Sequence, residues 1–576
     1  MACRSILSVF EQHAAISPDR IAFRMLDDGE HESARASFAE LRTEVARVAF
    51  CLKDAKAAGQ TVLVLTQQNI TFIQAFLGCL AAGCIAVPAA PPRPSRSITG
   101  VLAVARDAGV RHVLFDQSTA WIASVAPPGE DLARAQWISV PAALQCPALT
   151  SPLGPESPDD VAFLQYTSGS TGSPKGVVVS HGNLVDNEEV VRVAFGHGAD
   201  TVFVGWLPFF HDMGLIGNLL QPLYLGVTST LMPPAAFIQR PIRWLRAIDR
   251  YRATTSGAPD FAYRLCVQKI APEAVSDLDL RSWRVAFNGS EPVKGDTIEK
   301  FSAAFAPAGF DARAMFPCYG LAENTLFACG GRAGRNPVVN RFDVDAIGRG
   351  VAAQSGAGQP LVSVGHAWCG HRITIADPES RRLPEGRVGE ILIAGRSVAR
   401  GYWGKPKETD ETFGVMVQGE PEARYLRTGD LGFIFEGELY IAGRIKDVII
   451  IRGRNYYPQD IEQAVAGAAS DGHVDGTRLS AFSVHEQEIP KIVVVAELTR
   501  RGLREGAFEE LASRILDQVL PELDIEIHDI GFVPPGSLPI TTSGKPQRQL
   551  CRSRYIAGTL PFAWRSRSPV RAGQTV

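Results

Sequence analysis

One segment of the chain combines small residues, hydroxyl side chains and a cation in the way that an anion-binding turn requires. It covers residues 166–176 (YTSGSTGSPKG) and lies between the apolar runs VAFLQ and VVVS. Small residues let backbone amides approach an anion, and hydroxyl groups add further donors. The candidate anion-binding residues are Thr167, Ser168, Gly169, Ser170, Thr171 and Gly172, with Lys175 as the cation beside them.

The spacing within this segment separates it from the Walker A loop of P-loop NTPases. The pattern GxxxxGK[ST] is missing, and a strand rather than a helix is predicted to follow. Because Gly- and Ser-rich runs also mark ordinary turns, a flexible hairpin is the alternative interpretation of the segment taken alone.

Six further blocks extend the pattern over nearly the whole chain. They are 206–214 (WLPFFHDMG), 288–292 (NGSEP), 319–323 (YGLAE), 426–430 (LRTGD), 443–447 (GRIKD) and 542–545 (TSGK). With the loop, these blocks resemble, in composition and order, the motifs of the adenylate-forming superfamily. That superfamily includes acyl-CoA synthetases, luciferases and peptide-synthetase adenylation domains. The resemblance implies an enzyme that activates a carboxylate with ATP.

The blocks meet the main difficulty of this reaction, which is repulsion between two anions. Attack of a carboxylate oxygen on the α-phosphate of ATP forms a mixed anhydride with AMP, which makes AMP the later leaving group. Positioned cations and donors should therefore supply most of the catalysis. By resemblance, 167–172 and Lys175 hold the phosphates, and Glu323 coordinates the Mg²⁺ that bridges phosphate oxygens.

The resemblance also implies residues that bind the nucleoside. Tyr319 stacks on adenine, Asp430 accepts hydrogen bonds from both ribose hydroxyls, and Arg444 reaches the same ribose. Further nucleotide-binding residues implied by the two flanking blocks are Gly320, Leu321 and Ala322 on one side and Gly289, Ser290, Glu291 and Pro292 on the other. A core tyrosine, a turn aspartate and a surface ion pair are the plainer alternatives.

Lys545 is the residue that the resemblance assigns to the chemical step. Its ammonium can contact the carboxylate and the α-phosphate together, which neutralises charge as they approach. It lies far along the chain from the loop, so domain motion is implied. In the family the C-terminal domain pivots near the position of Asp447 and then presents a different face for thiol attack. His211 matches a histidine that flanks the acyl carboxylate, although a core histidine is the alternative.

Within the superfamily, the chain most resembles the fatty acyl-AMP ligases. The segments 443–462, 361–365 and 400–406 agree with that subgroup, whereas Val364 stands where a cysteine is expected. The segment 332–360 lies where those ligases carry an insertion that restrains domain rotation and disfavours CoA. The resemblance then implies acyl transfer to the phosphopantetheine thiol of an acyl carrier protein of a polyketide or nonribosomal peptide synthetase.

Three other interpretations stay open. If 332–360 is a neutral surface loop, an AMP-forming fatty acyl-CoA synthetase is the runner-up. Asp212 could anchor the ammonium of an amino acid, as in peptide-synthetase adenylation domains, although its apolar neighbours favour an acyl group. The last is a catalytically silent acyl-adenylate binder, which the joint presence of Lys545, Glu323 and Asp430 opposes.

The elements that must position these residues begin with a strand–helix rhythm. Buried strands are predicted at 61–65 and 111–116 and an amphipathic helix at 69–82, and the alternation continues to about residue 330. Continuous apolar strands alternating with helices predict parallel sheets covered by helices. We therefore expect an α/β fold whose large N-terminal domain contains two α/β subdomains.

Later segments change character. Residues 332–360 are rich in Gly, Arg, Ala and Asn and resemble an inserted loop or small flap, and 361–446 contains short β-type runs that predict a β-rich subdomain. We expect the N-terminal adenylation domain to cover 1–446 and a small mobile α+β domain to cover 447–576. In the latter, strands are predicted at 448–451, 479–485 and 491–498, with helices from about 458 and over 505–520.

Length, charge and cysteine content limit the possible domain number, binding partners and cellular location. A chain of 576 residues implies two or more domains, and a net charge of −3 gives no general attraction to nucleic acid or anionic membranes. Its ten cysteines form no CxxC pair. Gly83 and Pro88 interrupt the apolar run 71–90, which predicts a buried helix and a short strand rather than a membrane span. Without a secretory pattern at its N-terminus, the chain is expected to be cytoplasmic with reduced thiols.

Overall fold

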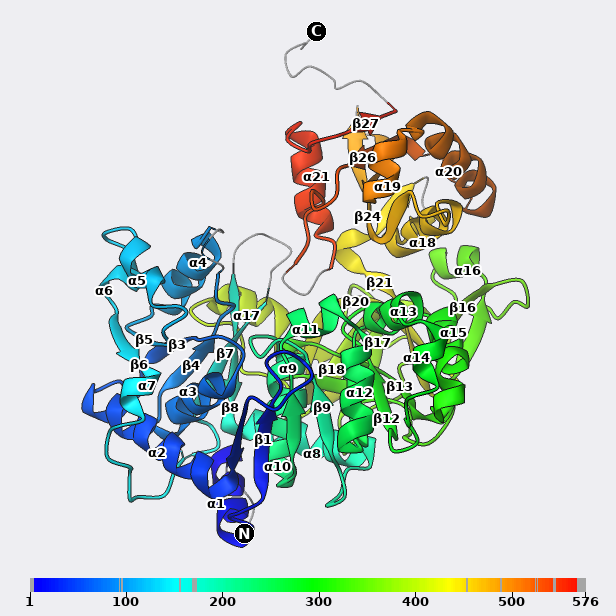
Figure 1. Ribbon diagram of the computed structural model, residues 1–576. Coiled ribbons are helices and arrows are strands. Elements are labelled where there is room, and N and C mark those ends of the chain that lie inside the picture. Colours follow the sequence, from blue (N-terminus) through cyan, green and yellow to red (C-terminus); the bar gives the residue numbers. More distant parts are fainter. Residues whose placement is uncertain are drawn as a thin grey trace.

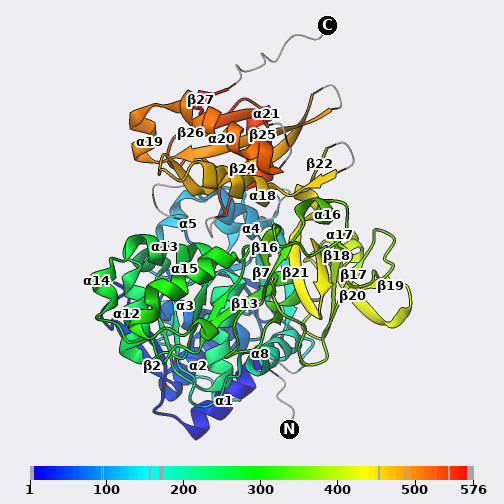
Figure 2. The same ribbon diagram turned by 90° about the vertical axis from the view of Figure 1, so that its right-hand side faces the viewer.

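The computed structural model describes residues 5–566 except 93, 95–96, 155–156, 168–173, 452–453, 487–488, 524, 526 and 542–544. These residues form a large N-terminal body and a smaller C-terminal lobe at one end of it (Figures 1 and 2). Residues 168–172 of the predicted phosphate loop, residues 542–544 before Lys545 and the residues from 567 onward lie outside the described residues.

The first α/β unit contains a sheet with the strand order β6-β5-β3-β4-β7-β8. Its strands are β3 (Thr61–Leu65), β4 (Ile85–Pro88), β5 (His112–Phe115), β6 (Gln136–Ser139), β7 (Val161–Thr167) and β8 (Lys175–Ser180). β3 pairs in parallel with β4 and β5, which confirms the parallel sheet predicted from the apolar runs. β7 and β8 are antiparallel, because the short connection between them allows only a hairpin.

The apolar run 71–90 forms a buried helix and a strand, as predicted. Helix α3 (Ile70–Ala81) begins after Asn69, whose side chain accepts a hydrogen bond from the Thr71 amide, and Gly83 adopts a positive φ of 73° before β4. α3 packs against α2 (Phe38–Asp54) in the largest hydrophobic core. In the described part of the chain, no helix is both long enough and apolar enough to cross a membrane.

The second α/β unit contains the sheet β14-β13-β12-β11-β9-β10-β1-β2. Its strands are β1 (Ile21–Met25), β2 (Ala34–Ser37), β9 (Phe203–Gly205), β10 (Ser229–Leu231), β11 (Thr255–Ala258), β12 (Val285–Asn288), β13 (Met315–Gly320) and β14 (Phe327–Gly330). Helices α12 (Ile242–Tyr251), α13 (Asp260–Lys269) and α15 (Gly295–Phe305) lie on its outer side (Figure 1). The largest core joins residues of both units, including Val62 of β3 and Phe23 of β1.

The β-rich part has the strand order β17-β18-β20-β19, with β21 paired to β20. Its strands are β17 (Arg372–Ala376), β18 (Gly389–Ala394), β19 (Val415–Val417), β20 (Glu420–Phe435) and β21 (Glu438–Arg444). The segment 332–360 is more regular than a loop. It contributes β15 (Val339–Phe342), α16 (Val344–Gly348) and the start of β16 (Gln359–Val362), and Phe342 is fully buried in a core with Tyr440.

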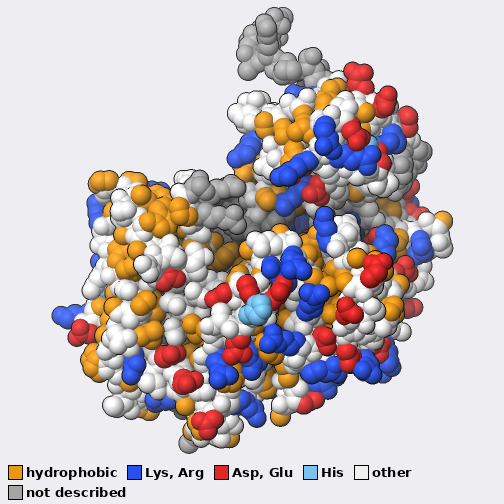
Figure 3. Space-filling view, viewed as in Figure 1, with side chains coloured by type: hydrophobic (Ala, Val, Ile, Leu, Met, Phe, Trp, Pro, Cys, Tyr) orange, Lys and Arg blue, Asp and Glu red, His pale blue; other side chains and the backbone are white. Residues whose placement is uncertain are grey.

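The C-terminal lobe contains the sheet β24-β25-β26-β27 and a core of its own. Its elements are β22 (Ile449–Ile451), β23 (Arg454–Tyr456), α18 (Pro458–Ala468), β24 (Val474–Glu486), β25 (Ile489–Leu498), α19 (Arg500–Glu505), α20 (Phe508–Leu523), β26 (Ile527–Val533), α21 (Arg548–Ile556) and β27 (Trp564–Arg565). The helix predicted at 505–520 begins three residues later, because Gly506 ends α19 in the left-handed conformation. Lys and Arg side chains are prominent on the face of this lobe that Figure 3 shows.

Candidate functional site

The predicted adenine and ribose residues are joined by hydrogen bonds. Tyr319 lies at the end of β13 and donates its hydroxyl to Oδ2 of Asp430 at 2.6 Å. The other oxygen of Asp430 accepts from Nε of Arg444 at 3.1 Å. Asp430 and Arg444 are directly opposite each other in the antiparallel pair β20–β21. Two strands and the end of a third therefore hold these side chains at one place.

Close backbone packing fixes the sequence blocks 288–292 and 319–323, which carry the predicted adenine-binding residues. A Cβ atom on Gly320 would come within 2.0 Å of the Leu326 carbonyl oxygen, and one on Gly289 within 2.9 Å of that of Cys318. Gly289 follows β12, whose neighbour in the sheet is β13, so the two blocks lie at the same sheet edge. Ser290 has a positive φ of 71°, a strained conformation that ends the strand sharply.

Glu291 and Pro292 complete the turn after β12, and Glu291 is tied to the neighbouring helix. Its Oε1 accepts a hydrogen bond from the Phe261 amide in α13 at 2.5 Å. Burial raises the pKa of the Glu291 carboxyl, while the charge of Lys545 opposes that rise. Glu291 therefore lies close enough to the C-terminal lobe for the two charges to interact.

Glu323 follows the Gly320, Leu321 and Ala322 segment and lies beside Tyr402 and Lys175. The Tyr402 hydroxyl donates to Oε1 of Glu323 at 2.8 Å, and the Lys175 Nζ lies 4.9 Å from the centre of the same tyrosine ring. Burial raises the pKa of the Glu323 carboxyl, and the hydrogen bond from Tyr402 opposes that rise. The predicted metal ligand and the predicted phosphate-binding cation thus share one neighbour.

A single carboxylate of this kind suits Mg²⁺, which is commonly held by one or two carboxylates together with substrate phosphates and water. Among the described residues, no group of three or more His, Cys, Asp or Glu could hold a metal ion without such help. The position of Glu323 near Lys175, the first residue of β8 after the predicted phosphate loop, is consistent with that arrangement.

Lys545 of the C-terminal lobe reaches the same place. Burial lowers the pKa of its ammonium, and the charge of Arg444 lowers it further. Glu291, Asp212 and Asp430 oppose this effect, and all three belong to the N-terminal body. The Lys545 ammonium is therefore within electrostatic range of the predicted ribose residues, the turn after β12 and the predicted acyl-binding block.

His211 and Asp212 stand between β9 and the π-helical segment Leu215–Leu220. The His211 Nδ1 lies 3.8 Å from Oδ1 of Asp212, which also accepts from the Met213 amide at 2.6 Å. Burial raises the pKa of the Asp212 carboxyl, but His211, the amide and Lys545 outweigh burial and lower it. Asp212 is therefore engaged by His211 and the Met213 amide, and its carboxylate lies within electrostatic range of Lys545, the residue predicted to act in the chemical step.

Sequence reasoning did not assign a role to Tyr402. The same is true of an ion pair close to the phosphate loop: Asp107 accepts from the Tyr166 hydroxyl at 2.8 Å and is also bonded to Lys405. The only signal was the stretch 400–406 (RGYWGKP), which marks the subgroup but does not indicate contact with β8. Such contacts, between residues 59 to 298 positions apart in the sequence, require the fold.

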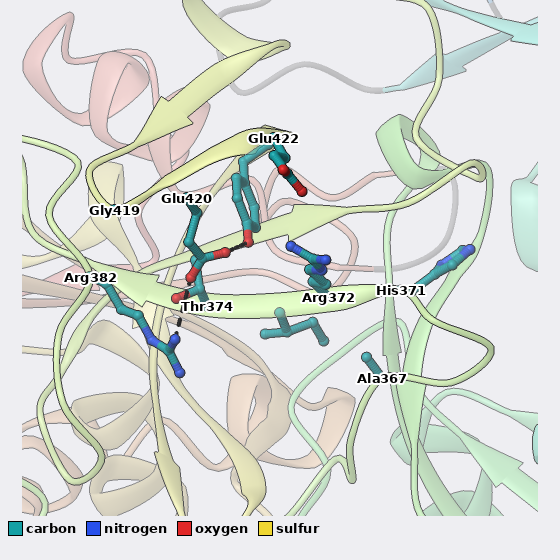
Figure 4. A pocket seen from close by; sticks show the side chains of 10 residues that line it. Ala367, His371, Arg372, Thr374, Arg382, Gly419, Glu420 and Glu422 are labelled. Carbon is teal, nitrogen blue, oxygen red and sulfur yellow. Dashed lines mark hydrogen bonds and ion pairs between the residues drawn. The ribbon is translucent and has the colours of Figure 1, made fainter.

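The β-rich part also has a cavity of about 620 Å³ that is separate from this site. It lies over β17 and β20, where Arg382 points toward Glu420 and His371 stands at the opposite end (Figure 4). Its described lining residues include none of the predicted site residues. The reaction site is therefore defined by the convergence of side chains and not by this cavity.

Comparison with known proteins agrees with these observations. Residues 10–403 match the family described as AMP-binding enzyme, and 446–564 match the AMP domain of the Disco-interacting protein 2-like family. The medium-chain fatty acid–acyl-carrier-protein ligase TtuA of Teredinibacter turnerae is 36% identical, over 98% of this chain and 95% of that protein.

Two solved structures are similar over nearly the full length. The fatty acyl-adenylate ligase of L. pneumophila, in complex with acyl adenylate and pyrophosphate, is 36% identical with a TM-score of 0.74, over 98% of both chains. A structure from studies of fatty acyl-adenylate ligases from E. coli and L. pneumophila is 30% identical with a TM-score of 0.86, over 96% of this chain and 98% of that one.

Proposed function

Because the chain belongs to the family of AMP-binding, adenylate-forming enzymes, we propose that it is a fatty acyl-AMP ligase. It joins a medium- or long-chain fatty acid to AMP with release of pyrophosphate. It then transfers the acyl group to the phosphopantetheine thiol of an acyl carrier protein. The observation that carries the proposal is that the Lys545 ammonium of the C-terminal lobe is buried within electrostatic range of Glu291, Asp212 and Asp430 of the N-terminal body.

The first half-reaction follows from the charges at the site. A fatty acid carboxylate oxygen attacks the α-phosphorus of ATP, and the bond from that phosphorus to the pyrophosphate oxygen breaks. Lys545 neutralises the approaching anions, and Lys175 attracts the leaving pyrophosphate. His211 orients the carboxylate. Bound Mg²⁺, held by Glu323, would supply further neutralisation of the triphosphate.

Residues of the N-terminal body position the nucleotide. Asp430 binds the ribose hydroxyls, supported by Tyr319 and Arg444, and adenine lies between Tyr319 and the turn 289–292. These groups are fixed by strand pairing before any ligand binds, so the α-phosphate is presented to the acid at little cost in ordering.

We place the boundary between an N-terminal domain and a mobile C-terminal domain at 446/447, with Asp447 as the pivot. Nη1 of Arg548 lies 3.1 Å from the Asp447 carboxylate, and the same guanidinium contacts Glu462 at 2.7 Å. This ion-paired cluster ties the pivot to α18 and α21 in the present orientation. In the second half-reaction the lobe rotates, the carrier thiol attacks the acyl carbonyl, and AMP leaves.

The segment 332–360 supports the choice of a carrier protein over CoA. Nε2 of Gln359, which follows this segment's helix, donates to Oδ1 of Asp460 in α18 at 3.2 Å. Phe342 packs in the same cluster as Tyr457, next to the pivot. Contacts of this kind oppose rotation of the lobe, and by the resemblance to the fatty acyl-AMP ligases we infer that this restraint disfavours CoA as the acceptor.

Two assays test the proposal. Pyrophosphate release with ATP, Mg²⁺ and laurate tests adenylation, and a protein that only binds acyl-adenylates would release none. Laurate, ATP and Mg²⁺ with either CoA or a phosphopantetheinylated carrier protein test the acceptor. We expect acyl-carrier product; efficient formation of lauroyl-CoA would instead identify an acyl-CoA synthetase.

A further inference from the structure

A short stretch of the β-rich part lies directly along the strand that follows the phosphate loop. The Arg400 amide donates to the Val178 carbonyl at 3.0 Å, and the Val178 amide donates to the Gly401 carbonyl at 2.9 Å. The Trp403 amide donates to the Gly176 carbonyl at 2.8 Å. Residues 400–403 therefore extend the sheet beyond β8, and their position is fixed relative to Lys175.

The side chain between these bonds, Tyr402, contacts two predicted site residues at once. Its hydroxyl donates to Oε1 of Glu323 at 2.8 Å, and its ring lies 4.9 Å from Nζ of Lys175. The ring packs edge-on against Phe413 at 5.3 Å, and the Tyr402 amide donates to Oγ1 of Thr409 at 2.9 Å. Phe413 and Thr409 of the β-rich part therefore hold the tyrosine in place.

A second backbone contact ties the same stretch to Glu323. The Ala399 amide donates to the carbonyl oxygen of Glu323 at 2.9 Å. Both the main chain and the side chain of Glu323 are therefore positioned by residues 399–402, which are distant from it in sequence.

We propose that Tyr402 is a positioning residue that sets the Glu323 carboxylate and the Lys175 ammonium at a fixed separation across one triphosphate. The inference rests on the roles assigned above to Glu323 and Lys175. The hydroxyl orients the carboxylate, because a hydrogen bond to one oxygen fixes the direction of the other. The ring face attracts the ammonium through a cation–π interaction, which limits where the lysine can point.

The two functions of Tyr402 can be separated by substitution. Tyr402→Phe keeps the ring beneath Lys175 and removes only the hydroxyl, whereas Tyr402→Leu removes both. Tyr425→Phe is a matched control, because that tyrosine also belongs to the β-rich part and also donates its hydroxyl to a glutamate, Glu420. Glu420 lines the cavity apart from the reaction site (Figure 4).

The decisive experiment is calorimetric titration of each full-length variant with ATP, with and without MgCl₂, in the absence of fatty acid. For Tyr402→Phe we expect ATP affinity without Mg²⁺ to stay within about twofold of wild type. The strengthening of ATP binding by Mg²⁺ should fall roughly 5- to 20-fold, as for loss of one hydrogen bond to a charged group. Tyr402→Leu should in addition lose about 2- to 5-fold in affinity without Mg²⁺.

Steady-state pyrophosphate release with laurate supplies a second measurement. Tyr402→Phe should raise the Mg²⁺ concentration for half-maximal rate, with a smaller change in the rate at saturating Mg²⁺, and Tyr425→Phe should match wild type. The proposal is overturned if Tyr402→Phe binds ATP with the wild-type dependence on Mg²⁺. It is equally overturned if the phenylalanine variant loses Mg²⁺-free affinity as strongly as the leucine variant.

These outcomes are distinguishable from failure of the proposed function. A wild-type protein that binds ATP with Mg²⁺ but releases no pyrophosphate with laurate would refute the ligase assignment, and the calorimetry would still decide the role of Tyr402. Should the leucine variant fail to fold, the phenylalanine variant alone decides, because it keeps the partly buried aromatic ring.

Discussion

The nucleotide residues of the N-terminal body and Lys545 of the C-terminal lobe are held in different ways. Tyr319, Asp430 and Arg444 bond to one another on paired strands. Lys545, by contrast, has its backbone held by its own lobe: its amide donates to Oγ1 of Thr541 at 3.0 Å, and the Thr541 amide donates back to its carbonyl at 2.8 Å. Its ammonium, however, is buried among charges of the other part.

This difference separates binding from chemistry. In the proposed function, the N-terminal body is organised to receive a nucleotide before the acid reacts, while the cation that lowers the barrier belongs to a separate lobe. Substitutions in the body should therefore change affinity, and substitution of the lysine should change the rate of the chemical step.

The largest expected effect is that of Lys545→Ala on adenylation. Removal of a cation positioned at the reacting anions should lower the rate of laurate-dependent pyrophosphate release by at least about 100- to 1,000-fold. ATP affinity should change by no more than about threefold, because the ribose and adenine contacts remain. Lys491→Ala, in β25 of the same lobe, is the control and should leave both quantities unchanged. Normal turnover in Lys545→Ala would refute the role of the lysine.

A smaller effect is expected for Asp430→Asn. The substitution keeps the shape of the side chain but removes the charge that accepts from Arg444 and, as proposed, from the ribose hydroxyls. The KM for ATP should rise roughly 10- to 100-fold, as for loss of charge-assisted hydrogen bonds, with a lesser change in kcat. An unchanged KM with a strongly reduced kcat would reverse the division between binding and chemistry.

The pH dependence of kcat/KM for ATP tests the contribution of Lys545, in the C-terminal lobe, separately from that of the N-terminal body. Burial lowers the pKa of Lys545 in the free enzyme from the ordinary value of 10.5. Since the charged form is required, kcat/KM should fall about tenfold per pH unit as pH rises through this lowered pKa. Lys545→Arg should lose that alkaline limb, because guanidinium stays charged. A wild-type limb at or above 10.5 would contradict burial of the lysine near the site.

The smallest effect concerns the contact between the segment 332–360 and the moving lobe. Deletion of 332–360 should raise lauroyl-CoA formation several-fold relative to the carrier product, if this segment restrains rotation. Gln359→Ala removes only the hydrogen bond to Asp460 and should raise the ratio about twofold. Gln354→Ala, an exposed glutamine in the same segment, is the matched control. An unchanged ratio in the deletion variant would exclude the segment from acceptor choice.

Local patterns predicted much of the framework. The apolar runs at 61–65 and 111–116 correspond to β3 and β5, because buried parallel strands have a recognisable composition. The blocks around Tyr319 and Asp430 were found from sequence because the chemistry constrains residue types over short stretches.

Long-range contacts could not be predicted in the same way. The hydroxyl of Tyr402 meets Glu323 only because residues 400–403 pair beside β8, and nothing in either local sequence encodes that pairing. The segment 332–360 lacked periodicity because its short strands and helix are stabilised by a few buried residues such as Phe342. The predicted phosphate-binding role of residues 168–172 stays a hypothesis, since these residues lie outside the described part of the chain.

The central claim is that Lys545 is needed to form the acyl-adenylate and not to consume it. Synthetic lauroyl-AMP, supplied to Lys545→Ala together with a phosphopantetheinylated carrier protein, isolates the second half-reaction. We predict that acyl-carrier product forms within about threefold of the wild-type rate, although the same variant makes almost no lauroyl-AMP from laurate and ATP. Loss of both half-reactions to a similar extent would contradict a cation delivered solely for adenylation.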